Sequence, residues 1–116
     1  MFRHPLAGSQ LVKGSIEPGE SAPDAAIREL FEEAGITCAR VTADLGIWEA
    51  IEGEQVWSFQ RCEIMQPLPD RWSHHCSDDG GHTFELFWHR LAQDPRDAFE
   101  IFVNAVRVIR ARLAAP

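Results

Sequence analysis

Residues 21–35 constrain the fold most, because this stretch carries the signals for both ends of one helix. Ser21 can accept a hydrogen bond from the backbone of Asp24, as the first residue of a capping box does. Pro23 falls in the first turn, where its missing N–H is harmless, and Gly35 suits the left-handed residue that ends a helix. We therefore predict a helix between Ser21 and Gly35. Its apolar stripe, which we expect to face a core, consists of Ile27, Leu30, Phe31 and Ala34.

Three carboxylates share one face of this predicted helix, because Glu29, Glu32 and Glu33 stand at positions i, i+3 and i+4. Like charges at that spacing repel one another, and a hard divalent cation would compensate them, since Mg²⁺ prefers oxygen ligands. Arg28 precedes Glu32 by four residues and can pair with it or with another carboxylate. A solvated acidic helix face is the alternative interpretation of the isolated triplet.

The surrounding residues decide between these interpretations. Residues 14–36 hold glycine, glutamate, arginine and aliphatic positions at the fixed spacing of the Nudix box, so the chain resembles the Nudix hydrolases. The matching positions are Gly14, Glu20, Arg28, Glu29, Leu30, Glu32, Glu33, Gly35 and Ile36.

The resemblance implies a divalent-metal-dependent hydrolase that cleaves a pyrophosphate bond in a nucleoside diphosphate linked to another moiety. It implies Mg²⁺ or Mn²⁺ as cofactor and a nucleotide-type small molecule as substrate. The implied catalytic residues are Glu29, Glu32 and Arg28, and the implied metal ligands are Gly14, Glu29, Glu32 and Glu33. Glu20 is expected to support them, while the identity of the general base and of the nucleoside diphosphate derivative stays open.

Four further residues are candidates for supporting or substrate-binding roles. Lys13 immediately precedes Gly14 and could touch a phosphate, although a solvated lysine at the end of a strand fits equally well. Asp78 and Asp79 lie in residues 66–81, which we expect to be a loop, and Glu85 lies just inside the next strand. In Nudix enzymes, the region after the hairpin commonly shapes the substrate pocket. These three acidic residues are therefore candidates for contacts with the substrate or the metal.

The remaining pattern predicts strands and a second helix. We expect a short strand at residues 10–13, a hairpin from residues 37–51 and 55–65, and a central strand at residues 83–91. Asp94 and Pro95 are expected to begin the second helix. Together with the resemblance, this order predicts one domain over residues 1–116, an α/β/α sandwich around a mixed β-sheet whose N-terminal strand is shortened.

Trp48 and Trp57 fall on the two arms of the predicted hairpin. Either ring can stack on a nucleobase, as aromatic side chains do in nucleotide pockets. The alternative is that both belong to the core, which is the commoner position for tryptophan in a strand.

Composition limits the partners. The net charge of −7 and the absence of a Lys/Arg stripe argue against long nucleic acid. No apolar run approaches the length of a membrane span, and Cys38, Cys62 and Cys76 form no CxxC pair, so we expect free thiols in the cytoplasm. A shortened first strand would leave a sheet edge unpaired, which predicts a homodimer.

Two other interpretations remain. The chain could be a non-catalytic Nudix-like module that binds a nucleotide or a protein, although such a module has no need of every carboxylate in the box. A short N-terminus would also fit an inactive fragment.

Overall fold

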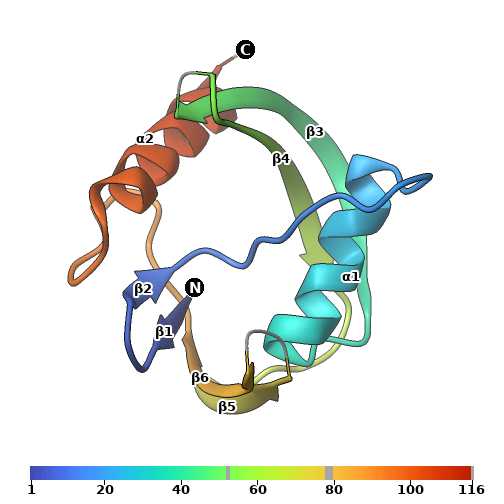
Figure 1. Ribbon diagram of the computed structural model, residues 1–116, viewed down its shortest axis with the longest axis vertical. Helices are drawn as coiled ribbons and strands as arrows, with labels where there is room; N and C mark the ends of the chain where they lie inside the picture. The colour runs from blue at the N-terminus through green and yellow to red at the C-terminus, as the bar shows by residue number, and fades with distance from the viewer. Residues whose placement is uncertain (52, 78–79, 116) are drawn as a thin grey trace.

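The computed structural model describes residues 1–51, 53–77 and 80–115 and has two helices and two antiparallel sheets (Figure 1). In chain order the elements are β1 (Phe2–His4), β2 (Gly8–Gln10), α1 (Ala22–Ala34), β3 (Ala39–Ile51), β4 (Gln55–Ile64), β5 (Arg71–Cys76), β6 (His82–Phe87) and α2 (Glu100–Ala114). Four strands form one sheet in the order β2-β1-β6-β5, while β3 and β4 pair separately. The predicted α/β class with two helices is confirmed, and the strand pairs in the described residues are antiparallel.

The long hairpin of β3 and β4 arches from one helix to the other, with the four-stranded sheet on the opposite side of the molecule (Figure 1). Helix α1 contacts both sheets through β3, β4, β5 and β6, whereas α2 contacts β3 at the far end of the hairpin. The two helices therefore lie toward opposite ends of the hairpin (Figure 1). Helix α1 is the element that joins the two sheets.

The main core lies between α1 and the four-stranded sheet. Phe2 of β1 stacks on Phe84 of β6 with ring centroids 4.2 Å apart. The other buried residues of this core are Ala34, Ile36, Cys76 and Leu86. The strand predicted at residues 83–91 corresponds to β6, which ends earlier than predicted, at Phe87. It lies between β1 and β5, as expected for a strand with large apolar side chains.

Helix α1 has the predicted ends. The Oγ of Ser21 accepts a hydrogen bond from the backbone N–H of Asp24 at 3.2 Å, and Gly35 ends the helix with a φ of 70°. The predicted apolar stripe is wrong at Phe31, which is 57% exposed, whereas Glu29 is only 8% exposed. The Glu29 carboxylate lies against the backbone of Gly14, and this contact shields it along with the apolar side chains of the helix.

The hairpin prediction is confirmed, since β3 and β4 pair in the expected order. Glu52, in the expected turn, lies outside the described residues. The strand predicted at residues 10–13 is wrong, because β2 ends at Gln10. The tight return after β1 pairs His4 with Gly8 and thereby moves the second strand toward the N-terminus.

The prediction of a loop over residues 66–81 is also wrong, because this segment contains β5, which pairs with β6 along its whole length. The period of two is present but is carried by polar and aromatic side chains. Trp72 and His74 are half-buried and Cys76 is buried, whereas the intervening Ser73 and His75 are exposed. Prolines before the strand and glycines after it favoured the loop interpretation.

The predicted start of the second helix is wrong by several residues. Helix α2 begins at Glu100 after Phe99, whose side chain makes no capping hydrogen bond. Asp94 does not cap the helix; its carboxylate accepts hydrogen bonds from Arg107 and Arg110 of α2 instead. A residue that looks like a helix cap in the sequence thus anchors the helix from the side.

Candidate active site

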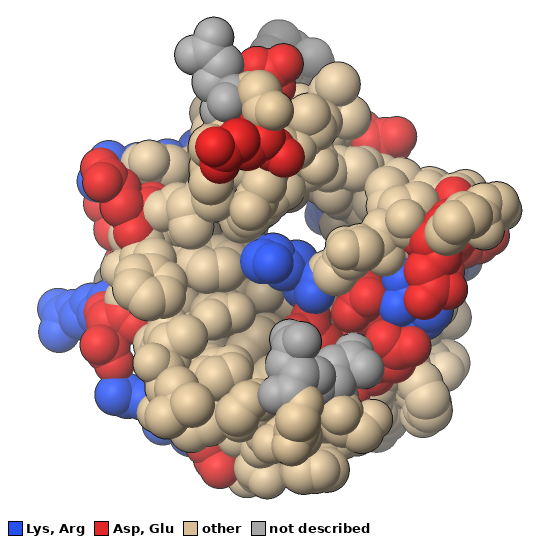
Figure 2. Space-filling view, viewed as in Figure 1, with Lys and Arg blue, Asp and Glu red and all other residues tan. Residues whose placement is uncertain are grey.

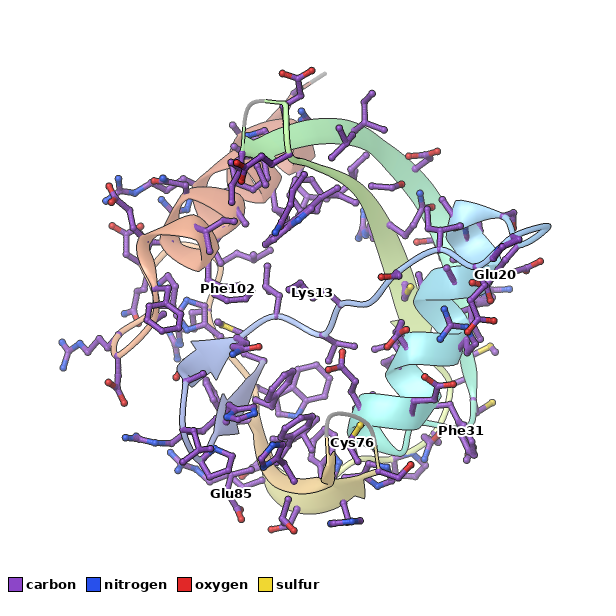
Figure 3. All side chains as sticks on the ribbon, in the orientation of Figure 1. Lys13, Glu20, Phe31, Cys76, Glu85 and Phe102 are labelled. Carbon is purple, nitrogen blue, oxygen red and sulfur yellow. The ribbon has the colours of Figure 1, made fainter. Side chains whose placement is uncertain are left out.

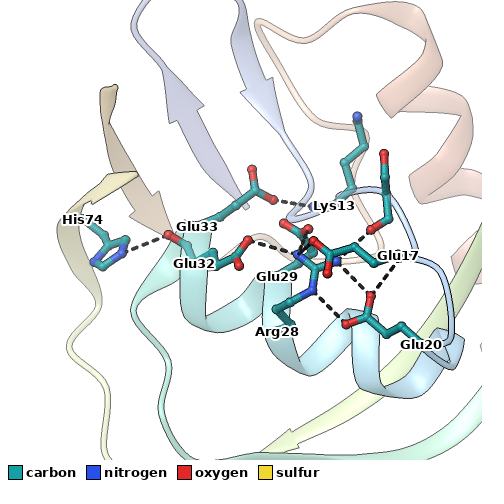
Figure 4. Close-up of polar contacts among 9 residues, drawn as sticks. Lys13, Glu17, Glu20, Arg28, Glu29, Glu32, Glu33 and His74 are labelled. Atoms are coloured by element: carbon teal, nitrogen blue, oxygen red, sulfur yellow. Dashed lines mark hydrogen bonds and ion pairs between the residues drawn. The ribbon is translucent and has the colours of Figure 1, made fainter. Parts of the chain in front are cut away.

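Arg28 lies at the centre of the acidic cluster on α1 (Figure 4). Its Nε and Nη2 donate hydrogen bonds to the two carboxylate oxygens of Glu20 at 2.8 and 2.9 Å. Its Nη1 donates to Glu29 Oε1 at 2.7 Å and to Glu32 Oε2 at 3.1 Å. Its Nη2 also donates to the carbonyl of Ser15 at 2.7 Å. One planar guanidinium therefore orients three carboxylates and the loop that precedes the helix.

Glu29 is the most shielded member of the cluster. Its carboxylate lies against the backbone of Gly14, where a Cβ atom would overlap it. Burying a carboxylate is costly unless it is paired, and Arg28 supplies the pairing. The glycine and the arginine thus hold Glu29 from two sides.

Glu33 connects the helix to the segment before it, at Lys13, which directly precedes Gly14. Its Oε1 accepts a hydrogen bond from the backbone N–H of Lys13 at 2.7 Å. The Lys13 side chain extends away from this contact, and its Nζ lies 5.6 Å from the ring centroid of Trp57 on β4. The backbone of Lys13 therefore belongs to the acidic cluster, while its ammonium belongs to a different surface.

The charges in the cluster stabilise one another. The hydrogen bonds from Arg28 hold the pKa of Glu20 below its usual value. Glu20, followed by Glu29, raises the pKa of Arg28. Glu17 adds a weaker interaction, with its Oε1 3.9 Å from Arg28 Nη1. Glu20 and Arg28 are consequently both ionised at neutral pH.

Strand β5 holds the carboxyl end of α1, which lacks a basic residue in its last turn. Trp72 Nε1 donates to the carbonyl of Ala34 at 2.8 Å, and His74 Nε2 lies 3.0 Å from the carbonyl of Glu32. This second contact is a hydrogen bond when Nε2 carries the ring proton. The two side chains satisfy carbonyls that a helix end leaves without partners. The sequence does not indicate this role, because the role depends on a strand in a segment whose pattern predicts a loop.

The structure does not bring all the predicted site residues together. Glu85 lies on the exposed face of β6, where it accepts a hydrogen bond from Ser73 at 2.8 Å. Figure 3 shows it on the opposite side of the molecule from Glu20. Asp78 and Asp79 lie outside the described residues.

The carboxylates do not form a ready-made metal site. Within residues 1–51, 53–77 and 80–115, no three His, Cys, Asp or Glu side chains are grouped so that they could hold a metal ion. Glu29 and Glu32 each direct one oxygen to Arg28, and Glu33 directs one to the Lys13 N–H. A carboxylate has two oxygens, however, and all the donors are of the hard type that Mg²⁺ binds. The chemical type of these residues therefore suits a hard dication.

Comparison with known proteins assigns the chain to a family. A family model described as NUDIX domain matches residues 2–98, which include the acidic cluster, both sheets and α1. The chain therefore belongs to the NUDIX family, and hence to a class of hydrolases. No curated protein and no solved structure matches it. Within the described part of the chain, no helix is both long and apolar enough to cross a membrane.

Proposed function

We propose that this protein is a divalent-metal-dependent hydrolase that cleaves a pyrophosphate bond in a nucleoside diphosphate linked to another moiety. Glu29, Glu32 and Glu33 would hold Mg²⁺ or Mn²⁺, with the carbonyl of Gly14 as a further ligand. The bound metal neutralises phosphate charge and lowers the pKa of a bound water. The proposal leaves open which derivative is cleaved.

The residues around these ligands have separate tasks. Arg28 orients Glu29 and Glu32, and Glu20 keeps the guanidinium in place through two hydrogen bonds. In the reaction, a water oxygen forms a bond to phosphorus and the bond from phosphorus to the bridging oxygen breaks. The water proton passes to a carboxylate of the cluster, and the leaving phosphate departs with the bridging oxygen.

One observation carries this proposal: a NUDIX domain in which a single arginine holds three carboxylates beside a glycine backbone. In this arrangement three carboxylates share the single positive charge of Arg28. A homodimer, a cytoplasmic location and a single domain over residues 1–116 stay predictions.

The decisive variant is Glu32→Gln combined with Glu33→Gln, which keeps the side-chain volumes and removes two charges. We expect it to lose activity on a panel of nucleoside diphosphate derivatives by more than the roughly 10–100-fold that outer partners of a metal site cost. The measurement is product formation with Mg²⁺ or Mn²⁺ and with chelator.

Glu63→Gln is the matched control, because Glu63 pairs with Arg40 at 2.6 Å on the exposed hairpin surface. This variant should keep full activity. Equal turnover in the double variant, the control and the unmodified protein would overturn the assignment of the cluster.

A second candidate function is a NUDIX module that binds a nucleotide without cleaving it. The observation in its favour is that Arg28 already occupies oxygens of Glu29 and Glu32. Nucleotide binding measured by calorimetry, with no product from any panel member at saturating Mn²⁺, would favour this module over the hydrolase.

A further inference from the structure

Lys13, the only lysine of the chain, links the acidic cluster to an aromatic surface. Its backbone N–H is bound to Glu33, and its exposed side chain reaches over Trp57. Figure 3 shows Lys13 in the middle of the molecule, between α1 and α2. In the same orientation, the space-filling view shows a hollow at this position (Figure 2). We call it the central hollow.

Four rings of the hairpin and α2 pack together, and we call them the aromatic cluster: Trp48, Trp57, Phe59 and Phe102. Trp48 and Trp57 are direct partners in the β3–β4 pair and meet edge to face, with centroids 5.4 Å apart. Phe102 of α2 lies behind Trp57 at 5.7 Å.

Exposure differs within the aromatic cluster. Phe59 and Phe102 are 8% and 4% exposed, so they belong to the interior. The two tryptophans are only partly buried. The phenylalanines thus support the tryptophans from behind, and Trp57 keeps a face that an ammonium can approach.

The contact between Lys13 and Trp57 is of a kind that a ligand can replace. An ammonium over an exposed ring is held weakly, whereas a nucleobase stacks on tryptophan over a large flat area. Once displaced, the Lys13 ammonium stays tethered beside Gly14, where the proposed metal ligands would hold a diphosphate. The same residue can therefore give up the ring and contact a phosphate.

We propose that the central hollow binds the nucleobase of the substrate, with Trp57 as the stacking surface and Lys13 as a phosphate contact. This inference rests on the proposed function and names which part of the chain recognises the substrate. Trp57 then determines specificity by stacking on the base. The proposal predicts that the protein prefers diphosphates that carry an aromatic base over diphosphates that carry none.

The test compares Trp57→Leu with Trp57→Phe, using ADP and inorganic pyrophosphate as ligands in buffer that contains Mg²⁺. We expect Trp57→Leu to weaken ADP binding at least tenfold in calorimetry, with pyrophosphate binding unchanged and with ADP binding largely kept in Trp57→Phe. In the turnover assay, Trp57→Leu should raise KM for base-containing substrates while kcat changes little. Lys13→Met should weaken both ligands, since both carry phosphates.

Trp88→Leu is the control, because Trp88 is 61% exposed and bonds only to the carbonyl of Pro69 among the described hydrogen bonds. Circular dichroism checks that each variant is folded. If Trp57→Leu binds both ligands normally, or loses both equally, the inference is wrong. Absent turnover in the unmodified protein would refute the hydrolase proposal, and the ADP binding comparison would still decide the role of Trp57.

Discussion

Gly14 matters for an atom that it lacks. The Glu29 carboxylate lies where a Cβ on residue 14 would be, so backbone and carboxylate approach more closely than any other amino acid would allow. The same residue would offer its carbonyl to the proposed metal. A sequence motif can name such a glycine, but only the structure identifies the group that replaces the missing atom.

Gly14→Ala should therefore displace the Glu29 side chain and lower activity by about tenfold or more, in the range seen when partners of metal ligands are changed. Stability should change little, because Gly14 does not have the positive φ that makes alanine strained. Steady-state kinetics and thermal unfolding measure the two effects.

Ser15→Ala serves as the control for Gly14→Ala. The carbonyl of Ser15, which accepts from Arg28, is retained in that variant. Normal activity in Gly14→Ala would mean that Glu29 has no fixed position in catalysis.

Some elements can be predicted because the residues that fix their ends act on near neighbours in the sequence, whereas other elements depend on contacts between distant residues. Helix α1 could be predicted at both ends because Ser21 and Gly35 act through bonds to near neighbours. Strand β5 could not, because its alternation is carried by polar and aromatic side chains, and because the helix end that it supports lies 38 residues away in the sequence. Likewise, Asp94 has the sequence signal of a cap, but two arginines a few turns along α2 compete successfully for its carboxylate.

The spacing of the acidic motif predicted which carboxylates would meet on α1, but not their present partners. Arg28 was expected to pair with one of them and in fact holds Glu20, Glu29 and Glu32 together. Glu85 was included because of its place after the expected loop, yet strand alternation turns it to the exposed face beside Ser73. Side-chain direction on a strand depends on register, which the motif does not contain.

The pairing of Asp94 with two arginines of α2 predicts how the stability of the protein depends on pH. Hydrogen bonds from Arg107 and then Arg110 hold the pKa of Asp94 below its usual value of 3.8. Because the folded-state pKa is depressed, the stabilisation is present above pH 3.8 and is lost as the pH falls through the lower folded value.

Asp94→Asn should accordingly reduce stability at neutral pH, and its difference from the unmodified protein should shrink below about pH 4. Denaturant unfolding at a series of pH values measures this. Asp70→Asn, at an exposed aspartate before β5, is a suitable control. A difference that stays constant down to the acid limit would contradict the role given to the Asp94 carboxylate.

On the scale of the whole molecule, the excess of negative charge gives a test that needs no substrate. The net charge is −7, and acidic side chains gather over the α1 side of the face in Figure 2. A cation that binds the folded chain and not the unfolded chain stabilises it by mass action.

Mn²⁺ at a hundredfold excess over its dissociation constant should therefore stabilise the protein by about 2.7 kcal/mol. The Glu32→Gln, Glu33→Gln double variant should show little of this gain in a thermal melt, and Glu63→Gln should show all of it. An equal gain in all three proteins would point to nonspecific screening of the net charge.

The separation of the two sheets has an evolutionary consequence. Among the described strands, the hairpin that carries Trp48 and Trp57 shares no ladder with the sheet that supports the carboxyl end of α1. Substitutions at Trp48 and Trp57 would therefore leave the strand pairing of the other sheet unchanged, even though β3 and β4 also contact α1. A scaffold divided in this way can acquire new substrates through changes in one arm while selection preserves the other.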